Sequence, residues 1–168
     1  MADYKLLVPK IKRWEAGWAN DPDDLGGCTM SGCTLNTYRS FYGQDKTCED
    51  LRKMTEKEWD NIFKSGFWNK CKGDDIKNQS VAELLVDFAY MSGVRTAVKA
   101  IQKIVGSTQD GVMGPITIGM INRSNQMLLF YKLWTYRHDY FYKIVERRPV
   151  SGKFLNGWIK RLSSYHFL

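Results

Sequence analysis

The strongest constraint on the fold is a helical pattern of apolar residues in the middle of the chain. Between Val81 and Ala89, apolar residues recur at intervals of three and four, so they share one face of a helix. Ser80 and Glu83 have the spacing of a capping box, which predicts where this helix begins, and Gly93 predicts where it ends. An amphipathic helix must bury its apolar face, so a packed helical domain is favoured.

Other segments carry the same kind of pattern. Apolar spacing, caps and breakers predict helices over residues 5–19, 36–42, 55–64, 94–105, 125–146 and 154–165, and one that begins at Pro115. Strand signals occur only near residues 25–35, where Thr, Cys and Gly predict a short hairpin or an irregular ribbon. The sequence therefore predicts a mainly α, single-domain protein.

Composition and charge narrow the class of protein. The 168 residues are 43% hydrophobic and 14% aromatic, which excludes a disordered chain. The net charge of +7 favours an anionic partner, although the alternative is that this charge only keeps the protein soluble. No helix carries the contiguous basic face that a nucleic-acid-binding protein would need. The apolar runs are too short to span a bilayer, and no signal peptide is recognised. We expect synthesis in the cytoplasm and, for any function outside it, another export route.

The cysteines do not have the spacing of a metal site. Cys28, Cys33, Cys48 and Cys71 include no Cys-x-x-Cys pair and lie far from both histidines, which argues against zinc. A chain of this length can fold without disulfides. We therefore predict four free thiols and no cofactor.

Glu15 is the most informative candidate for catalysis. It lies on the apolar face of the first predicted helix, between Ile11 and Trp18. An apolar surrounding favours the protonated carboxyl group, which is the form that a general acid needs. The alternative is that Glu15 turns to the edge of the helix and pairs with Lys12 or Arg13.

Three aspartates follow in the next loop. Asp24 lies nine residues beyond Glu15, and a second carboxylate near a buried glutamate is the pair that glycoside hydrolysis uses. Two glycines after Asp24 allow the backbone to double back, so Thr29 or Thr34 could face Glu15 across a cleft. An ordinary turn and a calcium site are the alternatives, although the spacing does not match an EF-hand loop.

These residues resemble a known family. Glu-Ala-Gly-Trp at residues 15–18, the segment 20–29, and then Gly32 and Thr34 are similar to the signature of the muramidases of glycoside hydrolase family 108. Some members are described as secretion activators or phage-like endolysins. Residues 86–93 resemble the family's Asp-Phe-Ala helix. Residues 100–102, together with 110–117, resemble its predicted peptidoglycan-binding segment, and residues 154–161 resemble its closing Gly-Trp-x-x-Arg element.

The resemblance implies a fold, a domain division and a reaction. It implies a lysozyme-like fold with a catalytic part over residues 1–95 and a helical peptidoglycan-binding segment over 96–168. The implied reaction is hydrolysis of the β-1,4 bond between N-acetylmuramic acid and N-acetylglucosamine. Glu15 would be the general acid, and Asp24 and Thr29 would assist it, with Asp21 and Thr34 as the alternatives.

The substrate and the rival function follow from the same resemblance. The expected partner is the glycan strand of the bacterial cell wall, bound by a monomer. The expected substrate-binding residues are Trp18, Asp21, Thr34, Trp68 and Tyr90. The segment 110–117 either contacts glycan or is purely architectural. The rival function is a catalytically inactive protein that binds peptidoglycan or assists secretion.

Overall fold

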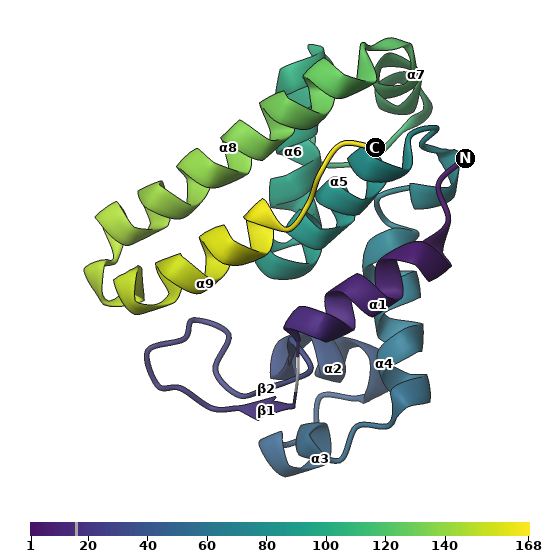
Figure 1. Ribbon diagram of the computed structural model, residues 1–168. Coiled ribbons are helices and arrows are strands. Elements are labelled where there is room, and N and C mark those ends of the chain that lie inside the picture. Colours follow the sequence, from purple (N-terminus) through teal and green to yellow (C-terminus); the bar gives the residue numbers. More distant parts are fainter. Residues whose placement is uncertain (16) are drawn as a thin grey trace.

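The computed structural model describes residues 1–15 and 17–168 (Figure 1). The N-terminal elements are α1 (Tyr4–Trp14), β1 (Trp18–Ala19), β2 (Thr29–Met30), β3 (Cys33–Thr34), α2 (Leu35–Tyr42), α3 (Cys48–Arg52), α4 (Glu56–Phe63), a π-helical turn η1 (Lys64–Trp68) and a 3-10 turn η2 (Gly73–Asp75). The C-terminal elements are α5 (Gln79–Ser92), α6 (Val94–Val105), α7 (Pro115–Arg123), α8 (Gln126–Arg147), a 3-10 turn η3 (Pro149–Ser151) and α9 (Gly152–Ser163). The predicted mainly helical fold is confirmed.

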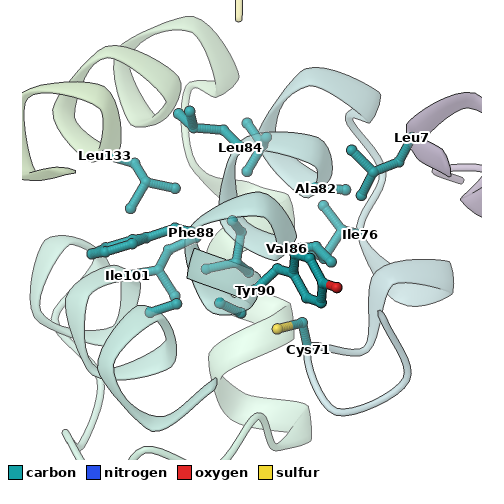
Figure 2. Packing of buried hydrophobic residues seen from close by; sticks show 14 of the residues in the cluster. Leu7, Cys71, Ile76, Ala82, Leu84, Val86, Phe88, Tyr90, Ile101 and Leu133 are labelled. Atoms are coloured by element: carbon teal, nitrogen blue, oxygen red, sulfur yellow. The ribbon is translucent and has the colours of Figure 1, made fainter. Parts of the chain in front are cut away.

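The core is built around α5. Every residue from Ser80 to Tyr90 is buried, because η1, α6 and α8 all contact this helix. Figure 2 shows side chains of α5, such as Leu84 and Phe88, among residues from the surrounding elements. The sequence predicts one buried face, but the neighbouring helices cover the helix on every side. A helix that is surrounded in this way forms the centre of the domain.

The cap of α5 differs from the prediction. Asn78 is the N-cap, and its side-chain oxygen accepts a hydrogen bond from the backbone N–H of Val81 at 3.0 Å. The predicted capping box of Ser80 is therefore wrong. Glu83 instead pairs with Lys10 on α1, which ties α1 to the start of α5. In contrast, the predicted box at Thr55 is present and begins α4.

A small antiparallel sheet follows α1. Its order is β1-β2-β3, with Trp18 opposite Met30 and Thr29 opposite Thr34. The two residues between β2 and β3, Ser31 and Gly32, both have positive φ. Positive φ at both positions is typical of a two-residue hairpin turn, so the hairpin expected near residues 25–35 is present.

The prediction of four free thiols is wrong. Cys28, just before β2, forms a disulfide with Cys48, the first residue of α3. The sequence pattern did not predict α3, whose capping box at Thr47 helps to place Cys48 beside the sheet. Cys33 and Cys71 are free and buried, and burial raises the pKa of each thiol to about 12.

The C-terminal half consists of helices that pack on α5 and on one another: α6 and α8 contact α5, and α9 contacts α8. The helices α8 and α9 run antiparallel and are joined through η3, and in Figure 1 they lie above the sheet, with α9 to the left of α1. No helix of residues 1–15 and 17–168 has the length and apolarity needed to cross a membrane. Over the same residues, no group of three His, Cys, Asp or Glu side chains could hold a metal ion.

Candidate active site

Glu15 lies at the end of α1 rather than within it. The predicted helix over residues 5–19 ends at Trp14, and Glu15 is the C-cap, with its backbone N–H donating to the carbonyl of Ile11. Its φ of −105° and ψ of 81° have already left the helix. Gly17 then has a φ of +74°, which glycine adopts without strain, and β1 follows. The predicted continuation through residue 16 falls outside the described residues.

The surroundings of Glu15 are charged rather than apolar. Its Oε1 accepts a hydrogen bond from Nη1 of Arg161 on α9, and 23% of its side chain is exposed. A Cβ at Gly32 would lie 2.7 Å from Oε2, so only glycine leaves room for the carboxyl group there. The alternative partners of Glu15 are engaged elsewhere: Lys12 pairs with Glu56, and the Arg13 guanidinium lies over the ring of Trp14.

Arg161 is itself held by a buried carboxylate. Asp87 on α5 accepts from Arg161 Nε at 3.0 Å and Nη2 at 2.6 Å, and from Arg137 Nη2 on α8 at 2.9 Å. Burial opposes the charge of Asp87, but the two guanidinium groups outweigh it and hold its pKa below the ordinary value. Burial likewise disfavours the charge of Arg161, but Asp87 and Glu15 raise its pKa. Arg161 therefore stays positively charged beside Glu15.

The loop that faces Glu15 brings Asp24 together with two threonines. Asp24 Oδ1 accepts a hydrogen bond from the backbone N–H of Gly26 at 2.8 Å. A Cβ at Gly26 would lie 3.3 Å from Asp24 Oδ1, 3.2 Å from the methyl group of Thr34 and 3.7 Å from that of Thr29. Gly26 thus lets these three side chains gather around it.

The same loop is fastened to the C-terminal helices. Lys153 on α9 donates to Asp21 at 3.0 Å and to Asp23 at 2.7 Å, and Arg148 donates to the backbone carbonyl of Asp23. Asp21, expected to bind substrate, therefore contacts Lys153 and does not line the cleft. These contacts join two parts of the chain that lie about 130 residues apart.

A cleft of about 570 Å³ runs between the two halves of the protein. Its N-terminal wall includes Trp14, Glu15, Asp24, Thr29 and Thr34. The opposite wall is formed by α8, η3 and α9, and includes Tyr140, Arg148, Phe154, Gly157, Trp158 and Arg161. Residues at the end of α5 complete the lining. The cleft therefore combines carboxyl groups, hydroxyl groups and an aromatic wall.

The predicted aromatic contacts are only partly found in this cleft. Trp68 is fully buried and donates to Asp74, so the expectation that it binds substrate is wrong. Trp18 lies in β1 under the guanidinium of Arg52 and does not line the cleft. Tyr90 does line it, but its hydroxyl is buried and donates to the carbonyl of Ser31 at 2.7 Å.

Apart from Tyr90, sequence reasoning missed aromatic residues that line the cleft, among them Trp14, Phe154 and Trp158. Trp14 lies one residue before Glu15, and Phe154 and Trp158 lie on α9. The signal for the α9 pair was available, because Phe154, Trp158 and Arg161 have the spacing of one helix face. The periodicity did not show that this face is turned toward a cleft.

Comparison with known proteins identifies the family. A family profile described as glycosyl hydrolase 108 matches residues 8–93, about half of the chain. The chain belongs to the glycosyl hydrolase 108 family. A second profile, described as a predicted peptidoglycan domain, matches residues 96–163 of this family member.

A solved structure supports the same assignment. The structure titled "Structure of Brucella abortus SagA" is 29% identical and superposes with a TM-score of 0.86. The match covers 96% of this chain and 90% of that one. No curated protein matches the chain. This glycosyl hydrolase 108 member is therefore a lysozyme-like protein that acts on peptidoglycan.

Proposed function

We propose that the chain is an N-acetylmuramidase, with the cell wall as its site of action. It would hydrolyse the β-1,4 bond between N-acetylmuramic acid and N-acetylglucosamine in bacterial peptidoglycan. The observation that carries this proposal is that Glu15, held by Arg161, and Asp24, on the facing loop, line one cleft. Hydrolysis of a glycoside needs one carboxyl group to protonate the leaving oxygen and a second one across the bond.

Glu15 has the position that a general acid requires. Its Oε1 is engaged by Arg161, and its Oε2 lies against Gly32. In this proposal Arg161 orients one oxygen, and the other delivers the proton to the leaving oxygen of the sugar when the carboxyl group is in its protonated form. Without the hydrogen bond from Arg161, the carboxyl group of Glu15 would be free to rotate. Arg161 is therefore a positioning residue in this proposal.

Asp24 and Thr29 would position the attacking water. Thr34 is the weaker candidate, because its hydroxyl caps α2 and accepts from the backbone N–H of Thr37 at 3.2 Å. Thr29 lines the cleft from β2 and is not the cap of a helix, which makes its hydroxyl the better candidate. A carboxylate and a hydroxyl that share a water favour the inverting mechanism, in which the anomeric configuration changes.

The variant Glu15→Gln tests the catalytic assignment. It keeps the shape of the side chain and removes the acid, so lysis of purified peptidoglycan should fall by about 10²- to 10⁴-fold. Glu146→Gln, an exposed glutamate of α8 outside the cleft, is the matched control and should keep full activity. Lysis by a folded Glu15→Gln variant at the wild-type rate would contradict the role of Glu15.

Analysis of the products tests the bond and the stereochemistry. Mass spectrometry of the released fragments should show N-acetylmuramic acid at the new reducing end. Proton NMR of the fresh products should show the α anomer first if Asp24 and Thr29 activate water. Binding of peptidoglycan without any cleavage would instead support the inactive binding protein.

A further inference from the structure

The face that α9 turns to the cleft has a distinctive composition. Phe154, Gly157, Trp158 and Arg161 all line the cleft, and their spacing of i, i+3, i+4 and i+7 puts them on one side of the helix. The helix lies at the lower edge of the α8–α9 pair in Figure 1. This face therefore carries two aromatic rings, a glycine between them in sequence and, one turn further on, the guanidinium group of Arg161 that binds Glu15.

Gly157 is unusual among the glycines of this chain. It lies in the interior of α9, where glycine weakens a helix relative to alanine. Its φ is not positive, and a Cβ built there would meet no atom within 4 Å. By contrast, a Cβ at Gly73 would lie 2.3 Å from the ring of Trp68. Neither backbone conformation nor internal packing therefore accounts for a glycine at position 157.

The open space at Gly157 belongs to the cleft. Gly157 is exposed, and a side chain there would project into the volume that the cleft leaves free. Beside it, the ring of Trp158 stacks on that of Phe154 at 6.0 Å and contacts that of Phe141 at 5.4 Å, and it remains partly exposed. The result is a flat strip of backbone and aromatic surface that ends near the carboxyl group of Glu15.

We propose that this strip is a saccharide subsite. One pyranose ring of the glycan strand would lie against the α9 backbone at Gly157, with its apolar C–H face on Phe154 or Trp158. Glycine permits such close approach of backbone to a ligand, and aromatic rings offer a flat apolar surface. The identity of the ligand rests on the proposed muramidase function. The new element is the part of the chain that would hold the sugar, namely this strip of α9.

This subsite unites binding and catalysis in one cleft. The segment 96–163, which matches the predicted peptidoglycan domain, would bind glycan through α9 and not through a separate surface. The other candidate in that segment, residues 110–117, does not line the cleft. Its turn is organised by Gln102, which donates to Asp110 at 2.8 Å and accepts from the backbone N–H of Gly111 at 3.0 Å. These hydrogen bonds hold the turn in its shape.

The variant Gly157→Ala separates the subsite from a structural role. Alanine is the better helix former, so the thermal midpoint should rise by about 2–4 °C. The added methyl group should fill the space of the sugar, so binding should weaken about tenfold. Gly157→Leu should weaken binding further while it keeps the helix. Gly119→Ala, in the middle of α7 and away from the cleft, is the control that should leave binding unchanged.

Binding is measured apart from turnover. Each variant is placed in the Glu15→Gln background and titrated with soluble glycan strands released from peptidoglycan by an amidase. If Gly157→Ala and Gly157→Leu are folded and bind these strands as tightly as the parent, the subsite proposal is overturned. Lysis by Glu15→Gln itself would contradict the catalytic assignment and leave the comparison at Gly157 intact. The two proposals can therefore fail independently.

Discussion

The buried charges around Asp87 carry a prediction about stability. Asp87 has no exposed side-chain area, and neither has Arg137, which binds it at 2.9 Å. Asp87→Asn removes the carboxylate and leaves the guanidinium of Arg137 in the core, where it also donates to the carbonyl of Leu84. Arg161 is less affected, because it keeps Glu15 as a partner.

The expected loss is large for a domain of this size. Removal of one partner from a buried ion pair destabilises a protein by about 3–5 kcal/mol, because the remaining charge is uncompensated. The total free energy of unfolding of a domain is only about 5–15 kcal/mol. We therefore expect Asp87→Asn to lose about 3–5 kcal/mol at pH 7, measured by urea denaturation.

The sign of the pH dependence follows from the pKa of Asp87. The two guanidinium groups, against the opposing effect of burial, hold this pKa below the ordinary value of 3.8. The stabilisation is therefore fully present above pH 3.8 and is lost as the pH falls through the lower pKa of the folded state. The difference between wild type and Asp87→Asn should be constant from neutral pH to about pH 4 and should shrink below it.

Two further variants make the result decisive. Glu49→Gln, which breaks the exposed pair between Glu49 on α3 and Lys53, should change the free energy of unfolding by less than about 1 kcal/mol. The double variant Asp87→Asn/Arg137→Met removes the stranded charge and should recover part of the loss. Equal urea midpoints for wild type and Asp87→Asn would refute the reasoning, as would a double variant no more stable than Asp87→Asn.

Two other features of the fold carry predictions. Thiol titration in denaturant without reductant should detect two thiols, from Cys33 and Cys71, and a count of four would contradict the disulfide. Because the disulfide closes a loop of 20 residues, Cys28→Ser should lower the free energy of unfolding by about 3 kcal/mol. Thr55→Ala removes the cap of α4 and should lower the free energy of unfolding by about 1 kcal/mol, measured as a lower thermal midpoint. Thr135→Ala, at an exposed position, is the control, and an unchanged midpoint for Thr55→Ala would contradict the prediction.

Local rules predicted much of the fold. The capping box at Thr55, the helix that begins at Pro115 and the end of α5 at Gly93 are all confirmed. These features depend on contacts within one helical turn, so neighbouring residues are sufficient to determine them. The sequence also placed Glu15 and Asp24 close together, and both line one cleft, because the helix, the turn and the hairpin that carry them lie within a short segment.

Long-range packing decided the rest. The partner of Glu15 is Arg161, which lies 146 residues away, and its position depends on Asp87 at the centre of the core. Likewise, Trp68 became a core residue, and Gly157 came to line the cleft, through the packing of whole helices. The spacing of residues along a helix predicts which side chains share a face. It does not predict what that face contacts, because the contacts of the face are determined by how the helices pack around α5.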